Sequence, residues 1–254
     1  MRYDNPVIDD IERKLKVAEG SPDYFLARGN CIKRDLLRRE ILQSYLIEHP
    51  SFANFGEGKT KRSRSQLSEA RVILRTGIKR LYDSWHYLVQ NVPSVVEDLT
   101  SANVIDLGNI INGTSGEAFR NVRVSMNLPN YTPPNPLKVP EMMEDLLTEV
   151  KAEDLHPIER AFYLHLGVAS TQPFCDGNKR VARMLQNKSL DEQWLPPATI
   201  HFSERRKYID LLEGAMNGYR EKDFKKQGPF FQYMAKKLAE SFEYVIRSTK
   251  RKKR

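Results

Sequence analysis

The sequence predicts a mainly helical protein with one small β-hairpin, and three observations indicate this fold class. Apolar residues recur at helical spacing through much of the chain. In one stretch, 119–135, polar and apolar side chains alternate instead, and several prolines follow. Hydrophobic residues are 40% of the 254 residues, enough to form a buried core. The length fits one large domain, or one domain with a helical appendage.

The predicted helices follow from their apolar stripes. The most regular stripe lies between residues 139 and 150, where six apolar residues recur at i, i+3, i+4, i+7, i+8 and i+11. A second stripe, 158–168, follows His156-Pro157, and proline is favoured in the first helical turn. Residues 67–85 and 206–215 also have helical periodicity. The charged first 54 residues predict further helices, packed against the rest as a separate element.

The exception is the segment 119–136. Arg120, Arg123 and Ser125 alternate with Val122, Val124 and Met126, and four prolines follow between residues 129 and 136. Because proline cannot donate a hydrogen bond within a sheet, this pattern predicts a short edge hairpin, which we call the flap.

Composition narrows the class of protein. The net charge is +8, and much of the excess lies in Lys59–Arg64 and in Lys250–Arg254. No aromatic-basic interleaving or nucleic-acid motif accompanies the charge, so we expect a solvated tail rather than nucleic-acid binding. No apolar run approaches the ~20 residues of a membrane span, and the start lacks a signal peptide. Cys31 and Cys175 have no spacing partner. We therefore expect a cytoplasmic protein.

The segment Gln172–Arg183 carries the chemistry. A predicted helix ends near Ser170, a turn follows at Asp176-Gly177-Asn178, and a new helix begins. A helix start preceded by glycine presents free backbone N–H groups and the positive end of the helix dipole, which favours phosphate. Arg180 and Arg183, three residues apart, share one helical face and fit a second phosphate contact. Asp176 is a suitable ligand for Mg²⁺ beside those phosphates.

As an ordered set, these residues resemble the Fic family signature H-P-F-x-[DE]-G-N-[GK]-R-x-x-R. Every specified position from Pro173 to Arg183 matches, and Gln172 stands where the family has histidine. Gly116–Arg120 resembles the family's G-x-F-R segment, and Leu155–Glu159 resembles its L-H-P-I/V-E helix start. The resemblance implies a Fic-like helical domain over 55–235, with an N-terminal helical region, 1–54, and a helix end and basic tail, 236–254.

The resemblance also implies the activity: transfer of AMP from Mg·ATP to a hydroxyl of a target protein that pairs along the flap. Asp176 would hold Mg²⁺ against the α- and β-phosphates. Backbone amides of Gly177, Asn178 and Lys179, with the Asn178 side chain, would bind the transferred phosphate. Such a site works by positioning and by electrostatic stabilisation.

Four more positions follow from the same resemblance. Arg180 would contact the β-phosphate region, and Arg183 the γ-phosphate. Tyr208 and Asn217 would lie on the adenosine side, although Asn217 falls one residue late in the alignment. Relatives of this kind often dimerise, so a homodimer is also implied.

Gln172 alters this expectation. The family's histidine acts as general base on the target hydroxyl, whereas a glutamine amide cannot accept that proton. Loss of general-base assistance typically costs ~10²–10⁴-fold in rate. The phosphate ligands are unchanged, so nucleotide binding should persist. Two functions therefore compete: an adenylyltransferase impaired at Gln172, and a nucleotide-binding pseudoenzyme that acts in protein interaction or regulation. The glutamine itself is either a natural substitution or one introduced to trap an inactive state.

Many Fic proteins also carry an inhibitory helix with the motif [ST]-x-x-x-E-[GN], whose glutamate pairs with the second motif arginine. Residues 53–58 contain the pair Glu57-Gly58, with Ala53 at the Ser/Thr position. Glu57 is therefore either the inhibitory carboxylate that reaches Arg183 or part of an ordinary loop.

Overall fold

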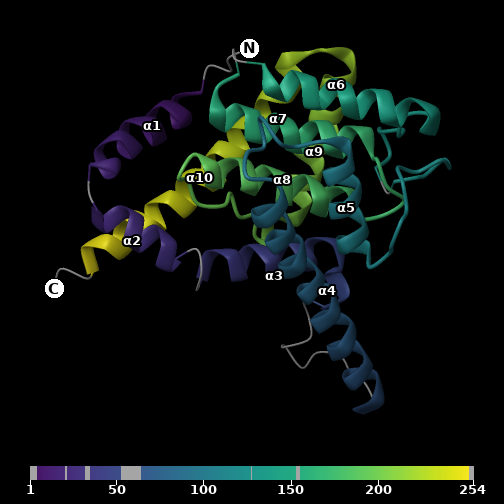
Figure 1. The fold of residues 1–254 in the computed structure, drawn as a ribbon, viewed down its shortest axis with the longest axis horizontal. Coiled ribbons are helices and arrows are strands. Elements are labelled where there is room, and N and C mark those ends of the chain that lie inside the picture. The colour runs from purple at the N-terminus through teal and green to yellow at the C-terminus, as the bar shows by residue number, and fades with distance from the viewer. Residues whose placement is uncertain are drawn as a thin grey trace.

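The computed structural model describes residues 5–20, 22–31, 35–52, 64–126, 128–152 and 155–251. Figure 1 shows a helical fold. The helices are α1 (Pro6–Glu19), α2 (Pro22–Cys31), α3 (Leu37–Glu48), α4 (Arg64–Asn91), α5 (Ser101–Asn112), η3 (Pro136–Lys138), α6 (Val139–Lys151), α7 (Pro157–Thr171), α8 (Asn178–Glu192), η4 (Phe202–Glu204), α9 (Arg205–Glu221) and α10 (Phe224–Arg251).

Helix α7 is the centre of the core. It is buried along nearly its whole length and packs against α6, α8 and α9. Gly167 lets α6 approach closely, because a Cβ atom at this position would lie 2.3 Å from Cδ1 of Leu146. Because α7 is buried on nearly every side, it provides the fixed support from which the loop after it extends.

The N-terminal helices lie on two different parts of the molecule. Helices α1 and α2 pack along α10, which is yellow in Figure 1 and runs out to their side. Helix α3 instead contacts α4 and α8, so its C-terminal end lies beside the start of α8. One element of the N-terminal region is therefore close to the predicted phosphate loop.

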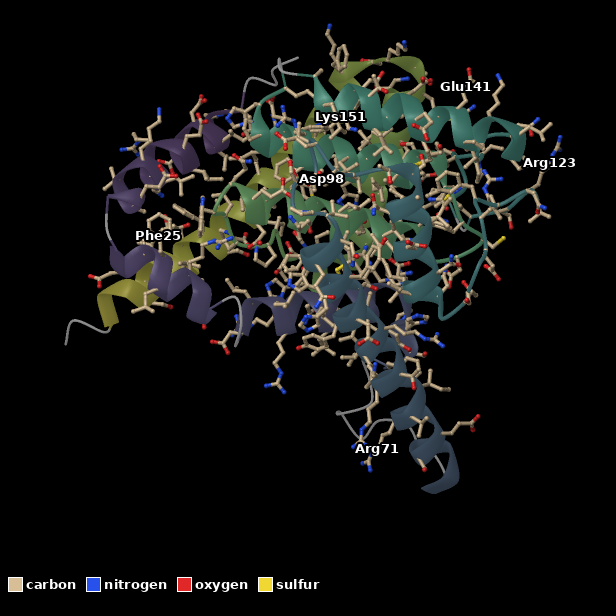
Figure 2. All side chains as sticks on the ribbon, in the orientation of Figure 1. Phe25, Arg71, Asp98, Arg123, Glu141 and Lys151 are labelled. Atoms are coloured by element: carbon tan, nitrogen blue, oxygen red, sulfur yellow. The ribbon has the colours of Figure 1, made fainter. Side chains whose placement is uncertain are left out.

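Helix α4 leaves the body of the molecule with its N-terminal half projecting, and Arg71 lies on that projection (Figures 1 and 2). Its C-terminal half packs against α5. Helix α5 has clear end signals: a Thr100–Asn103 capping box begins it, and Gly113 ends it with φ +70°.

The predicted helices at 67–85, 139–150, 158–168 and 206–215 are confirmed as α4, α6, α7 and α9. The predicted hairpin is not confirmed, because the described part of 119–136, which omits residue 127, contains no strand. The four prolines lack the N–H groups of a ladder, and Arg120 joins the two arms through its side chain instead. Arg123 lies at the edge of the molecule (Figure 2).

Within the ranges that the structure describes, no helix has the length and apolar character needed to cross a membrane. The proposed domain boundaries at 54 and 235 remain predictions. Glu57, its segment 53–58, and most of the basic residues of 59–64 and 250–254 lie outside the described residues.

Candidate active site

The loop between α7 and α8 is held by its own side chains. Gln172 ends α7 in the left-handed region at φ 50°, and Gly177 begins α8 at φ 82°. A Cβ atom on Gly177 would lie 2.5 Å from Asn112 Oδ1, so the turn requires glycine on both conformational and steric grounds. Phe174 is buried, and its ring lies against Gly108 of α5, where no side chain could fit.

Asn178 connects the two ends of this loop. Its Oδ1 accepts a hydrogen bond from the Phe174 N–H at 2.8 Å. Its Nδ2 donates to the Phe174 carbonyl at 2.8 Å and to Gln172 Oε1 at 2.9 Å. The buried Asn178 amide therefore fixes the loop around the first turn of α8, whose N–H groups have no acceptor within the helix.

A cavity of about 270 Å³ opens over this helix start. It brings together five of the predicted site residues: Gln172, Asp176, Gly177, Asn178 and Lys179. The remaining walls come from α3, the flap, the loop and α9, namely Glu48, Ser125, Met126, Leu128, Cys175, Arg205, Ile209 and Leu212. Cationic, amide and apolar surfaces thus meet in one space, as binding of a nucleotide requires.

Asp176 and Arg180 form an ion pair at 2.8 Å, one helical turn apart. The Asp176 side chain is 81% exposed, whereas that of Arg180 is 7% exposed. Among the described residues no cluster of three His, Cys, Asp or Glu side chains could hold a metal alone. Mg²⁺ commonly takes one or two carboxylates and completes its shell with phosphate and water, so the accessible Asp176 fits this ion.

Arg183 is one of the most enclosed side chains, at 1% exposure. Its Nε donates to Ser44 Oγ at 2.9 Å, and its Nη2 donates to the Ser44 carbonyl at 3.0 Å. The same Nη2 donates to Glu48 Oε1 at 3.1 Å. Arg183 does not line the cavity, because α3 covers it.

Glu48 also pairs with Lys179, whose Nζ lies 3.0 Å from Oε2. Burial by itself raises the pKa of Glu48, but the charges and hydrogen bonds of Lys179 and Arg183 outweigh burial and lower the pKa to about 2. The carboxylate is therefore ionised throughout the ordinary pH range. Glu48 is therefore the carboxylate that the structure brings to Arg183, the contact that the family motif suggested for Glu57.

The sequence held a signal for this contact. Ser44 and Glu48 satisfy the Ser-x-x-x-Glu spacing of the inhibitory motif, with His49 where the motif has Gly or Asn. Residues four apart on a helix share a face. The Glu-Gly pair at 57–58 matched the end of the motif but lacked the serine, whereas 44–48 matched its start.

Both polar atoms of the Gln172 side chain make hydrogen bonds within the loop and the end of α7. Its Oε1 accepts from Asn178 at 2.9 Å, and its Nε2 donates to the Ala169 carbonyl at 2.6 Å. The side chain is 4% exposed. Gln172 therefore contributes to the loop's structure in addition to lining the cavity.

Arg120 ties the flap to the loop, a role that the sequence did not predict. Its Nε donates to the Gln172 carbonyl at 2.6 Å. Its Nη1 and Nη2 donate to the carbonyls of Val122 and Pro134 at 2.9 and 2.8 Å. One buried guanidinium thus holds both arms of the flap beside the cavity.

Tyr208 does not line the cavity, which differs from its predicted place beside adenosine. It is fully buried, and its hydroxyl accepts from Arg183 Nη1 at 3.2 Å. The same oxygen lies 2.9 Å from His165 Nε2, while His165 Nδ1 lies 2.7 Å from Gln186 Oε1. Burial lowers the pKa of His165 to about 3, so the neutral imidazole accepts from Tyr208 and donates to Gln186. His165 is therefore a packed core histidine.

Asn217 also lies outside the cavity wall. Its Nδ2 donates to the Asn130 carbonyl at 3.1 Å, and Glu213 Oε1 accepts from the Asn130 N–H at 2.7 Å. Both side chains therefore hold the tip of the flap against α9. The apolar residues that α9 gives to the cavity are Ile209 and Leu212.

Comparison with known proteins agrees with this geometry. Residues 98–190 match the Fic/DOC family. The chain is 27% identical over 231 residues to a protein adenylyltransferase Fic of Nematostella vectensis, covering 84% of this chain and 51% of that protein. It is 31% identical over 134 residues to a protein of the same name in Drosophila willistoni, covering 52% of this chain and 26% of that protein. The chain thus spans about half, or less, of these relatives.

Solved structures share the fold over almost the whole chain. A Fic domain containing signaling protein from Bacteroides thetaiotaomicron superposes with a TM-score of 0.70 at 20% identity, covering 96% of this chain and 98% of that one. Fic-1 of C. elegans superposes with a TM-score of 0.65 at 21% identity, covering 97% and 75%. The described part of the chain therefore has a Fic-like helical fold, and residues 98–190 within it match the Fic/DOC family.

Proposed function

We propose that the chain is a Fic-type protein adenylyltransferase that is held inactive by Glu48 and impaired by Gln172. The observation that carries this proposal is the cavity over the start of α8, where Asp176, the free amides and Lys179 meet. The named relatives, protein adenylyltransferases Fic, support the reaction class.

In this proposal the phosphates of ATP enter the cavity and the α-phosphate lies against the amides of Gly177, Asn178 and Lys179. Ile209 and Leu212 offer apolar contact on the nucleoside side. Asp176, released from Arg180, would hold Mg²⁺, which neutralises phosphate charge when bound. Arg180 is then free for the β-phosphate. These steps bind and orient the nucleotide.

A target chain lies along the flap, whose two arms Arg120 holds beside Gln172. The target hydroxyl oxygen bonds to the α-phosphorus of ATP, the bond to the β-phosphate oxygen breaks, and pyrophosphate leaves. The hydroxyl proton needs an acceptor. The Gln172 amide cannot take it, so the proton passes to solvent water without general-base assistance, and transfer is slower by ~10²–10⁴-fold.

Glu48 imposes a second restraint. While its carboxylate bonds Arg183, the γ-phosphate has no access to that guanidinium, and α3 covers the site. Productive binding therefore requires α3 to withdraw Glu48. The expected γ-phosphate role of Arg183 is reachable only in that state.

The alternative is a nucleotide-binding pseudoenzyme that uses the cavity and flap for regulation. The engaged Gln172 side chain favours this reading, because its hydrogen bonds make it part of the loop. Association as a homodimer remains an additional prediction, to be measured by sedimentation.

The deciding experiment is transfer of label from α-labelled Mg·ATP, with self-modification as the readout. It uses the chain itself, Gln172→His, Glu48→Gly and the double variant. We expect transfer to appear with Gln172→His and to be greatest in the double variant. No transfer in any variant, with Mg·ATP bound in calorimetry, would establish the pseudoenzyme. No binding in any variant would overturn both functions.

A further inference from the structure

Glu48 is bridged by two cations, one on each carboxylate oxygen. Arg183 Nη2 lies 3.1 Å from Oε1, and Lys179 Nζ lies 3.0 Å from Oε2. Lys179 and Arg183 stand four apart on α8 and so share one helical face. The three side chains are only 1% to 22% exposed, where charge pairs are less screened than at the surface.

The two cations are held very differently. Arg183 is fixed by Ser44, Tyr208 and its own burial. Among the described residues, Glu48 is the one partner of the Lys179 ammonium, and Lys179 itself lines the cavity. Its ammonium is a compact charge on a flexible stem, whereas a guanidinium makes fixed directional bonds. Lys179 can therefore change partner without disturbing the fold.

The charge of Lys179 is also the largest of the influences that lower the pKa of Glu48, ahead of Arg183. Arg183 bonds one oxygen of the Glu48 carboxylate and Lys179 pairs with the other, so two cations hold α3 on the site.

We infer that the Lys179 side chain is the second half of the inhibitory contact and exchanges Glu48 for a nucleotide phosphate when α3 withdraws. This inference rests on the proposed function and specifies its regulation. In the closed state Lys179 opposes nucleotide binding by holding Glu48. In the open state the same ammonium, now free at the cavity wall, favours nucleotide binding.

The two roles have opposite signs, which gives a sharp test. Mg·ATP dissociation constants are measured by calorimetry for the whole chain, Lys179→Met, Glu48→Gln and the double variant, all in the Gln172 form. With Glu48 present, Lys179→Met loses both the ion pair and the phosphate contact, so a gain and a loss of about fivefold offset each other and the constant should stay within about twofold of the parent. With Glu48→Gln, Lys179→Met should weaken binding about fivefold.

Two further variants control the comparison. Lys236→Met removes an exposed lysine of α10 that does not line the cavity, and it should change neither constant. Lys179→Arg keeps the cation and should restore both constants to within about twofold of the parent. Thermal unfolding of each variant checks that all are folded.

The outcomes separate the inference from the function beneath it. A Lys179→Met weakening of equal size with and without Glu48, which means no coupling between the two positions, would overturn the inference while Mg·ATP binding stands. Absence of Mg·ATP binding in all of these proteins would overturn the proposed function and the inference together.

Discussion

Glu48 Oε1 accepts a hydrogen bond from Arg183 Nη2 at 3.1 Å across 135 residues of sequence. Both side chains are well enclosed, at 17% and 1% exposure. Removing one member of a buried ion pair leaves the other charge uncompensated. The contact therefore joins α3 to α8, and a competing anion must replace Glu48 before Arg183 can be used.

Glu48→Gln should raise Mg·ATP affinity about tenfold, because the phosphate no longer competes with a carboxylate for Arg183 and Lys179. Calorimetry measures the constant directly, independently of transfer. Glu141→Gln is the control, since Glu141 is an exposed glutamate of α6 (Figure 2). Equal affinities for the parent and Glu48→Gln would show that Glu48 does not restrain binding.

Arg120→Lys should loosen the flap, because one ammonium cannot reach the three carbonyls that the guanidinium bonds. We expect faster amide exchange over the flap and a loss of about 2–3 kcal/mol in unfolding free energy from unpaired buried groups. Hydrogen exchange and urea unfolding measure these. Arg123→Lys, at the exposed edge of the same flap, should leave both unchanged (Figure 2). Unaltered exchange in Arg120→Lys would contradict the tie.

Tyr208→Phe distinguishes support of Arg183 from nucleotide contact. Its hydroxyl joins Arg183 to His165, so its loss should destabilise the fold by about 1–2 kcal/mol. In the Glu48→Gln background it should weaken Mg·ATP binding and leave Mg·ADP binding unchanged, because only the γ-phosphate uses Arg183.

The matched control is Tyr233→Phe. Tyr233 is also buried, but its hydroxyl has no hydrogen-bond partner among the described residues. That variant should be neutral or slightly stabilising. Equal weakening of Mg·ATP and Mg·ADP by Tyr208→Phe would instead return Tyr208 to the adenosine side.

The features that the sequence predicted correctly are those encoded by a few neighbouring residues. The stripe of 139–150 needs only helical periodicity, and it formed α6. The turn at Gly177 is also local, since its φ of 82° requires glycine. The match at 172–183 therefore identified the loop, and six of its residues do line one cavity.

The structure departs from expectation where the direction of a side chain or a contact distant in sequence mattered. Tyr208 occupies the expected helix but faces Arg183, because its fully buried ring points into the core. Residues 120–126 alternate as a strand would, yet side-chain bonds from Arg120 take the place of a ladder. The Ser44–Glu48 spacing is a local signal, but the contact itself depends on how α3 packs against α8.

Glu40 gives a prediction about pH, because it is buried on α3 behind Arg183. Burial raises its pKa to about 7, and Arg183 with the polar Thr199 and Asn187 offsets only part of that cost. The unfolded carboxyl titrates near 4.5, so stability is full below that pH and is lost as pH rises to about 7. Glu40→Gln should remove this loss, about 2–3 kcal/mol between pH 5 and 7.5 in urea unfolding. Histidine titration contributes equally to the unfolding free energies of the parent and of Glu40→Gln, so it cancels in the difference between them. Parallel stability curves for the two proteins would contradict the prediction.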